Sequence, residues 1–321
     1  MQKIIVTGGS GFMGTNVVES LIKDGYVILN IDIAQPVKEN HLQYWKPINI
    51  LDYQKLEAAI IAFNPEIIIH LAAVTDLNGT DLDYYLVNTV GTKNVIEVAS
   101  KISGLKKVIY TSSMLVCKLG FIPNDYNTYN PHTVYGESKV KGELLVKEIQ
   151  NSNYDWLIIR PTSIWGPWFK APYIDFFKIV YFKKFFRFKN ACNKTYGYIE
   201  NTVFQIKSLI NADNVHGKTF YLGDVPATNI SEWANEISFE MGKGEIKNIP
   251  YSFVKALAIL GDILKKFKIK FPMSSFRLLN MTTNNVLPLK DLNDIVGTPP
   301  YSRLEGTKKT VRWMKENKII S

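Results

Sequence analysis

Short apolar segments of strand length alternate with amphipathic segments of helical length through the first half of the chain. The apolar segments are rich in β-branched residues and nearly uninterrupted, which is typical of strands buried on both faces. They span residues 3–6, 27–31, 67–71, 107–111 and 155–160. Between them, apolar residues recur at helical spacing in residues 16–23, 53–63, 90–100 and 138–150. The alternation predicts an α/β fold built on a doubly wound parallel sheet.

The character of the chain changes after Gly166-Pro167, where an aromatic, lysine-rich stretch and later a basic apolar segment follow, at residues 176–189 and 250–272. Between these two segments, a helical pattern and a strand pattern occupy residues 201–211 and 218–222. We therefore expect a sheet domain of residues 1–165 to which residues 196–223 return. Residues 166–195 and 224–321 are expected to form a smaller, mainly C-terminal substrate domain.

Composition limits the cellular setting. The chain has 321 residues, 46% of them hydrophobic, and can bury a large core. Its two cysteines, Cys117 and Cys192, are too few for a disulfide framework, which favours a reducing compartment. The chain starts with a strand-like run rather than a signal sequence, and no segment reaches the ~18 to 20 uninterrupted apolar residues of a spanning helix. We expect a cytoplasmic protein.

A glycine-rich turn, TGGSGFMG at residues 7–14, follows the first expected strand and leads into a helix that we expect to begin near Thr15. Its glycines Gly8, Gly11 and Gly14 let the backbone turn tightly and approach a pyrophosphate. A helix N-terminus adds free N–H groups and partial positive charge. The segment predicts a phosphate-binding turn, although an ordinary strand-to-helix turn has similar features.

Asp32 stands at the end of the second expected strand, 18 residues after Gly14. A carboxylate there can accept both hydroxyls of an adenosine ribose, whereas it would repel a 2′-phosphate. The position therefore favours NAD over NADP; the alternative is a turn Asp after a strand.

Three further residues have the chemistry of a proton-transfer site. Tyr135 and Lys139 are four residues apart, and on a helix such positions share a face, so the ammonium can lie beside the phenol and lower its pKa. Ser113 follows the fourth expected strand and could hold a substrate hydroxyl or carbonyl against the phenol oxygen. Taken alone, the Tyr/Lys pair is also typical of a solvent-facing helix.

As an ordered set, these motifs resemble the extended short-chain dehydrogenase/reductase family of nucleotide-sugar epimerases and dehydratases. The similarity runs from Lys3 to about Trp313, and further matching segments are HLAA at 70–73, NTVGT at 88–92 and RPTSIWGP at 160–167. The resemblance implies a Rossmann domain that binds NAD, with Tyr135 as base and acid, Lys139 lowering its pKa and gripping the nicotinamide ribose, and Ser113 polarising the reacting carbonyl. It implies a bracing role for Asn88 and no metal site.

The residues that the resemblance assigns to the cofactor come from six parts of the sequence. They are Gly8, Gly11, Phe12, Met13, Gly14, Asp32, Asn49, Ile50, Leu71, Ala72, Ala73, Tyr135, Lys139 and Pro161. The residues assigned to the substrate are Thr75, Ser113, Ser163 and Lys194. The family often has Asp at Asn49, Asn at Ser163, Arg at Lys194, and Val-Tyr-Gly where this chain has Val116-Cys117-Lys118, so the substrate pocket is expected to depart from the usual nucleotide pocket.

Charge is concentrated in the second half of the chain. Residues 1–150 carry 13 Lys and Arg against 15 Asp and Glu, whereas residues 151–321 carry 25 against 14. Phe253, Leu257, Leu260, Leu264 and Phe267 recur at helical spacing among lysines, which predicts a basic amphipathic helix. Its apolar stripe either packs into the substrate domain or lies against an anionic membrane.

The leading functional hypothesis is an NAD-dependent epimerase of a nucleotide- or polyprenyl-diphosphate-linked sugar, acting at carbon 4 through a keto intermediate in cell-surface polysaccharide biosynthesis. One alternative is a reductase or dehydrogenase of a keto sugar or a steroid-like alcohol, and another is a non-catalytic dinucleotide-binding regulator. The basic residues interleave with Phe and Leu in no nucleic-acid motif, so we expect no nucleic-acid partner. The expected assembly is a homodimer, with peripheral contact to the inner face of the membrane.

Overall fold

A seven-stranded parallel sheet forms the centre of the protein. The computed structural model describes residues 1–188, 191–267, 269, 271 and 274–321. The strand order is β10-β6-β5-β4-β1-β2-β3, and every adjacent pair is parallel. The strands are β1 (Lys3–Thr7), β2 (Val27–Ile31), β3 (Trp45–Lys46), β4 (Ile67–His70), β5 (Lys107–Thr111), β6 (Asp155–Pro161) and β10 (Thr219–Leu222). This confirms the predicted doubly wound fold, in which ligands bind where the strand order reverses, beyond the carboxyl ends of β1 and β4.

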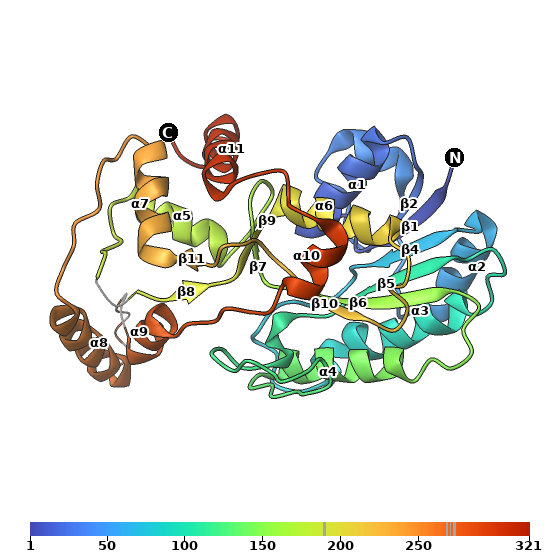
Figure 1. The fold of residues 1–321 in the computed structure, drawn as a ribbon, viewed down its shortest axis with the longest axis horizontal. Helices are drawn as coiled ribbons and strands as arrows, with labels where there is room; N and C mark the ends of the chain where they lie inside the picture. The colour runs from blue at the N-terminus through green and yellow to red at the C-terminus, as the bar shows by residue number, and fades with distance from the viewer. Residues whose placement is uncertain (189–190, 268, 270, 272–273) are drawn as a thin grey trace.

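Helices cover both faces of this sheet (Figure 1). Ile4 and Val6 face the cluster that holds the apolar residues of α1 (Phe12–Lys23) and α6 (Ile199–Asn211). Ile5, between them, packs in the cluster of the opposite face, formed with α2 (Tyr53–Phe63), α3 (Thr92–Ala99) and α4 (Val134–Lys147). Alternate residues of a strand point to opposite faces, so a strand buried on both sides needs the uninterrupted apolar run seen in the sequence.

Two helices begin earlier than their apolar periodicity predicts. α1 starts at Phe12, directly after Gly11, rather than near Thr15. α4 starts at Val134 instead of residue 138, because the Thr133 hydroxyl caps it by accepting a hydrogen bond from the Gly136 amide at 3.0 Å. The first turn of each helix contains a glycine, Gly14 in α1 and Gly136 in α4, and glycine is a poor helix former, so the sequence pattern does not mark these turns as helical. The earlier start places Tyr135 and Lys139 on one helix.

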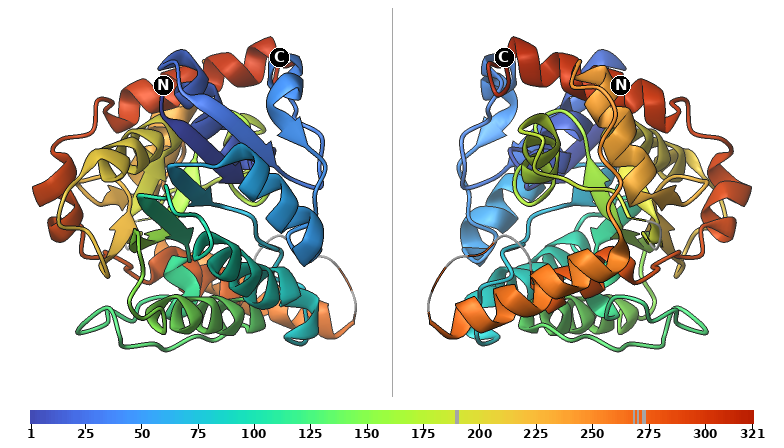
Figure 2. Two further views of the ribbon diagram at one scale, coloured as in Figure 1. Left: turned by 90° about the vertical axis from the view of Figure 1, so that its right-hand side faces the viewer. Right: turned by 90° about the vertical axis from the view of Figure 1, so that its left-hand side faces the viewer.

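Most of the remaining elements form a second layer beyond the carboxyl ends of the sheet strands (Figures 1 and 2). Here β7 (Ser163–Trp165) pairs with β9 (Tyr196–Tyr198), and β8 (Asn193–Lys194) pairs with β11 (Thr228–Asn229). The helices are α5 (Tyr173–Tyr181), α7 (Ile230–Glu240), α8 (Tyr251–Lys266), α9 (Ser275–Thr282), α10 (Lys290–Val296) and α11 (Arg303–Glu316). Trp165 anchors the layer, with its ring centroid 4.8 Å from that of Trp233. The chain returns to the main sheet at β10; the proposed domain division itself stays a prediction.

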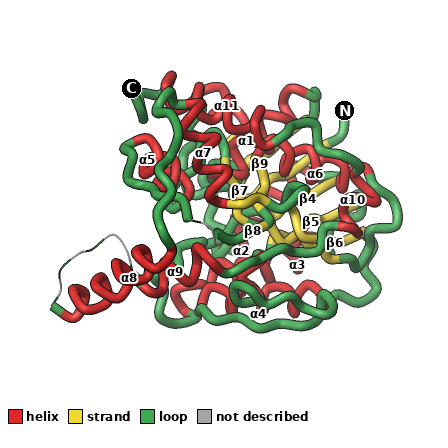
Figure 3. The backbone as a smooth tube through the Cα atoms, turned by 60° about the vertical axis from the view of Figure 1, so that its left-hand side comes forward, coloured by secondary structure: helices red, strands yellow, loops and turns green. Residues whose placement is uncertain are grey.

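The predicted basic amphipathic helix is α8, which protrudes from the body with α9 at its base (Figure 3). The predicted stripe does not pack inward as a unit. Leu257 and Leu264 are half-buried, whereas Phe253, Leu260 and Phe267 are exposed. Lys268, Lys270 and Pro272 of the segment lie outside the described residues. Within the described part of the chain, no helix is long and apolar enough to cross a membrane.

Candidate active site

The backbone of the glycine-rich turn packs closely on itself and on the neighbouring strand end, and its glycines place no side chains where a phosphate would bind. Gly8 has a φ of +73°, and a Cβ atom there would lie 2.6 Å from the Ala72 nitrogen. A Cβ on Gly14 would lie 2.2 Å from the Gly8 carbonyl oxygen. Gly11, the N-cap of α1, brings no side chain to its first-turn amides. These amides and the partial positive charge of the helix therefore fit the pyrophosphate of a dinucleotide.

Asp32 is fixed beside this turn. One carboxylate oxygen accepts a hydrogen bond from the Ser10 amide and the other from the Ala34 amide, each at 2.9 Å. The carboxylate is thus held directly after β2 and next to the glycine-rich turn, at the spacing that suits the adenosine ribose.

The other residues that the sequence assigns to the cofactor or its support lie near strand ends, at the start of α1 or in the sheet core. Asn88 braces the loop after β4: its amide accepts from the Val74 nitrogen at 2.8 Å and donates to the Ser138 hydroxyl at 2.9 Å. Ile50 is buried in the sheet core, and the Asn49 side chain accepts from the Leu51 amide. The remaining ones follow strand ends or open α1, namely Phe12, Met13, Leu71, Ala72, Ala73 and Pro161.

The three expected catalytic residues gather at the carboxyl end of β5. Tyr135 is buried on α4, and burial raises its pKa to about 12, while the adjacent Ser113 hydroxyl acts to lower it. The Lys139 ammonium donates to the Thr111 carbonyl oxygen at 3.0 Å. Burial lowers the Lys139 pKa to about 8.

Tyr135 therefore needs positive charge near its oxygen before it can exchange a proton at neutral pH. Lys139 and oxidised NAD would both supply that charge. The chemistry of Tyr135, Ser113 and Lys139 thus fits NAD, the cofactor that the glycine-rich turn and Asp32 indicate.

Two tyrosines that the sequence did not indicate complete the cluster. The ring centroid of Tyr85 lies 5.9 Å from that of Tyr135. Tyr173, from α5 of the second layer, is close enough to raise the Tyr135 pKa. Burial raises the pKa of Tyr173 itself, and its hydrogen bond with the Ser163 hydroxyl acts to lower it. No motif marks Tyr173, because only the docking of the second layer on the sheet brings it to the site.

The expected substrate residues lie at different distances from this cluster. Ser163, on β7, is connected to the cluster by the hydrogen bond between its hydroxyl and Tyr173. Lys194 is half-buried on β8, where its ammonium donates to the Asn280 carbonyl oxygen at 2.6 Å. Thr75 is exposed in the loop after β4, and Cys117 is buried, with its thiol 3.5 Å from the Thr128 carbonyl oxygen. The site assignments stay predictions.

Comparison with known proteins agrees with this fold. The model of the NAD dependent epimerase/dehydratase family matches residues 4–177. N-acetyl-alpha-D-glucosaminyl-diphospho-ditrans,octacis-undecaprenol 4-epimerase of Escherichia coli O157:H7 is 26% identical over 97% of this chain and 95% of its own. A vaccinia virus 3 beta-hydroxysteroid dehydrogenase/Delta 5-->4-isomerase is 35% identical, over 52% of this chain and 53% of its own. The crystal structure of UDP-glucose 4-epimerase from Thermotoga maritima superposes with a TM-score of 0.75 at 19% identity, covering 98% and 99% of the two chains.

A Rossmann sheet with a glycine-rich turn, an acidic residue after β2 and a Tyr/Lys pair on α4 defines a nucleotide-dependent enzyme of the short-chain dehydrogenase/reductase class. The chain belongs to the NAD dependent epimerase/dehydratase family. This confirms the predicted enzyme type, an NAD-dependent epimerase of the extended branch, with NAD as its cofactor.

Replacing Asp32 with Ala should weaken NAD binding by about 10- to 150-fold, because a charged hydrogen-bond partner of the ribose hydroxyls contributes about 1.5 to 3 kcal/mol. The unchanged protein should bind NAD more tightly than NADP, and the variant should lose this preference. Isothermal titration with both dinucleotides measures each affinity. Asp24→Ala, in the turn after α1, is the matched control; tighter binding of NADP by the unchanged protein would contradict the role of Asp32.

The buried Lys139 should make stability depend on pH. Its pKa in the folded protein, about 8, lies below the ordinary 10.5, so between these values the unfolded chain binds more protons than the folded one. The free energy of unfolding contributed by this group therefore rises as pH increases from about 8 to about 10.5. Urea unfolding across that range should show a rise that Lys139→Met lacks. Lys141→Met, an exposed lysine of the same helix, should keep the rise; equal profiles for all three proteins would refute the shift.

Proposed function

We propose that this protein is a 4-epimerase of a sugar linked to a diphosphate, carried on either a nucleotide or a polyprenol, and that it serves cell-surface polysaccharide synthesis. The observation that carries the proposal is the meeting of Tyr135, Ser113 and Lys139 beside the dinucleotide turn, with Tyr173 of the second layer facing them. A sugar placed between the layers would present a hydroxyl to Tyr135.

Each residue of the cluster has a defined task in this reaction. Bound NAD supplies the acceptor, and then the donor, of the hydride at the sugar carbon. Tyr135 takes the hydroxyl proton as the keto sugar forms and gives it back when the carbonyl is reduced. Ser113 donates a hydrogen bond to the same oxygen. Lys139, held by the Thr111 carbonyl, supplies positive charge beside the nicotinamide ribose and keeps the phenolate accessible.

Inversion at the carbon requires the keto sugar to turn within the site so that its other face meets the hydride. The pocket walls are aromatic rather than charged near Tyr135, because Tyr85 and Tyr173 lie beside it. Such walls let a sugar ring rotate, while the diphosphate stays anchored. Lys194, half-buried on β8 in the basic half of the chain, is the cation that we assign to the diphosphate.

The reductase or dehydrogenase alternative uses the same three residues and is favoured by the steroid dehydrogenase similarity. That similarity covers about half of this chain, whereas the similarity to the undecaprenol-linked sugar epimerase extends through nearly all of it, second layer included. Because the second layer holds the substrate in this proposal, the longer match supports the sugar reaction. We also propose a homodimer as the working assembly.

Incubation with UDP-, GDP- and undecaprenyl-diphosphate-linked sugars, followed by analysis of the released sugars, tests the proposal. We expect one or more sugars to be converted to their 4-epimers without net formation or loss of NADH. Stoichiometric change in NADH absorbance would identify a reductase or dehydrogenase instead. NAD binding with no turnover of any compound in the panel would favour the regulator.

A further inference from the structure

Helix α8 turns its larger apolar side chains away from the protein. Its inner face consists of Val254, Ala258 and Gly261, which are buried, and the first two pack against Phe188 and Leu278. On the outer face Phe253 is 55% exposed, Leu260 44% and Phe267 71%. Ile259 and Ile263 are exposed between them. A helix of a globular domain normally turns its bulky apolar stripe to the core, so this reversed pattern indicates a surface that is covered when the protein works.

Basic residues border this outer face. At 100° per residue, Lys255 and Lys266 stand side by side at one edge of the exposed apolar arc, and both are exposed. Across residues 250–282 the sequence has six basic residues and one acidic residue, Asp262. Leu279 of α9 and Ile269 add exposed apolar side chains beside the helix. We call the outer face of α8 together with these two residues the α8 surface.

We infer that the α8 surface docks on an anionic lipid bilayer. Its bulky apolar arc enters the boundary between headgroups and acyl chains, and its lysines meet the lipid phosphates, as in interfacial helices. A second copy of the chain suits it less, because a twofold contact would bring two strongly basic segments together. Figure 3 shows α8 projecting from the body, so the helix can reach a flat surface without obstruction by the Rossmann sheet.

The α8 surface is joined to the residue that we assign to the substrate diphosphate. The Asn280 carbonyl of α9 accepts the Lys194 ammonium, and the Met281 carbonyl accepts the Cys192 amide at 3.1 Å. A bilayer at α8 therefore lies next to the diphosphate end of the substrate pocket. This inference rests on the proposed function in one respect: it selects the polyprenyl-linked form of the substrate, whose lipid remains in the bilayer while its sugar reaches Tyr135.

Flotation of the full-length protein with vesicles tests the docking. We expect it to float with vesicles of equal parts phosphatidylglycerol and phosphatidylcholine, and far less with phosphatidylcholine alone. Leu260→Asp should reduce the partition coefficient at least about tenfold, because a leucine leaves the apolar phase and a negative charge enters. Ile61→Asp is the matched control, because Ile61 is a similarly exposed apolar residue (50%) that lies on α2 of the sheet domain, and this variant should float like the unchanged protein.

Three outcomes would overturn the inference. They are no flotation with anionic vesicles, equal flotation of Leu260→Asp and the unchanged protein, or an oligomer in sedimentation velocity that Leu260→Asp alone disrupts, which would identify a second copy as the occupant. Circular dichroism and NAD titration verify that each variant is folded. The flotation assay contains no sugar substrate, so its failure leaves the epimerase proposal standing, and flotation without turnover refutes only that proposal.

Discussion

Tyr135→Phe is expected to lower turnover by about 100- to 10,000-fold while NAD affinity stays nearly unchanged. The substitution removes a single oxygen from a buried ring whose surroundings, Tyr85 and Tyr173 among them, remain in place. That oxygen is the atom that exchanges the proton with the sugar hydroxyl, whereas the dinucleotide is held by the glycine-rich turn and Asp32. The loss should therefore fall on kcat rather than on cofactor binding.

Steady-state kinetics on the substrate found in the panel, together with NAD titration, measures this separation. Tyr154→Phe is the matched control, because it also removes a buried phenol oxygen, one that faces the Tyr110 hydroxyl in the core between the sheet and its helices. The control should retain activity within a few fold. Near-native turnover by Tyr135→Phe would remove this residue from the mechanism, and equal losses in both variants would point to a general effect of losing a buried hydroxyl.

The parts of this protein that the sequence predicts are those whose signals are local. Runs such as residues 67–71 are mostly apolar because both faces of the strand are covered. This pattern predicts the sheet and the alternation of its strands with helices. The glycine-rich turn is recognisable because Gly8 and Gly14 have no room for a Cβ atom, a constraint within a few residues of chain. Motif order then suggests which side chains meet at the strand ends.

The parts that the sequence misses depend on contacts between distant segments. The Lys139 ammonium donates to the Thr111 carbonyl oxygen because β5 ends next to α4 there, a contact that residue spacing within the helix does not predict. Tyr173 joins the site only after the second layer docks. The amphipathic pattern of α8 indicates an apolar stripe, but the choice of Val254 and Ala258 as the packed face is decided by Phe188 and Leu278, far away in sequence.

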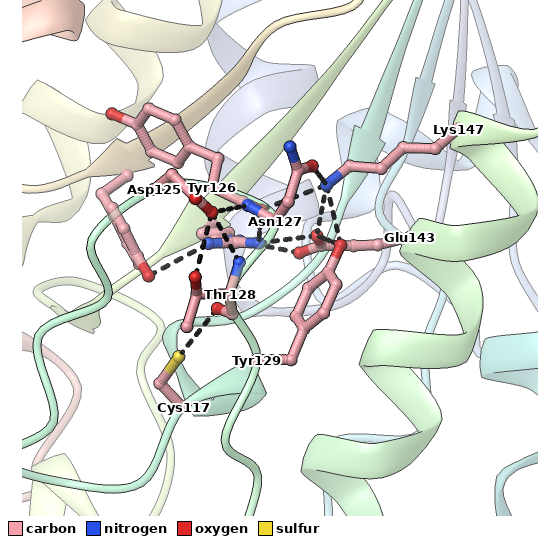
Figure 4. A network of polar contacts seen from close by, with 10 residues as sticks. Cys117, Asp125, Tyr126, Asn127, Thr128, Tyr129, Glu143 and Lys147 are labelled. Carbon is pink, nitrogen blue, oxygen red and sulfur yellow. Dashed lines mark hydrogen bonds and ion pairs between the residues drawn. The ribbon is translucent and has the colours of Figure 1, made fainter.

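A buried ion pair beneath the site was also not foreseen. Arg160 of β6 and Glu143 of α4 form two hydrogen bonds of 2.8 Å, with 0% and 1% of their side chains exposed. The Tyr129 hydroxyl donates to the same carboxylate at 2.9 Å, and Figure 4 shows Glu143 meeting the loop that contains Asp125 to Tyr129. Within the loop the Asp125 carboxylate accepts a hydrogen bond from the Thr128 amide, and the Lys147 ammonium donates to the Asn127 side-chain oxygen, each at 2.8 Å. The pair thus joins the sheet, α4 and this loop in one network.

Glu143→Ala should lower the free energy of unfolding by about 3 to 5 kcal/mol, because it leaves the Arg160 guanidinium charged and unpaired in the interior. The pKa of Arg160 lies far above neutral, so the guanidinium stays protonated and charged when its partner is removed. Urea unfolding at neutral pH measures the loss. Asp294→Ala, which breaks the exposed Lys290–Asp294 pair, is the control and should change stability little.

Glu143→Ala should also affect catalysis. Glu143 lies one helical turn beyond Lys139 on α4, and its carboxylate helps to keep the Lys139 ammonium charged. Under conditions where Glu143→Ala is still folded, we expect weaker NAD binding and slower turnover, as α4 loses its tie to β6. Replacing both partners, with Glu143→Leu and Arg160→Met, removes the unpaired charge and should recover part of the stability. A double variant as unstable as Glu143→Ala would mean that the wider tyrosine network, rather than the stranded guanidinium, accounts for the loss.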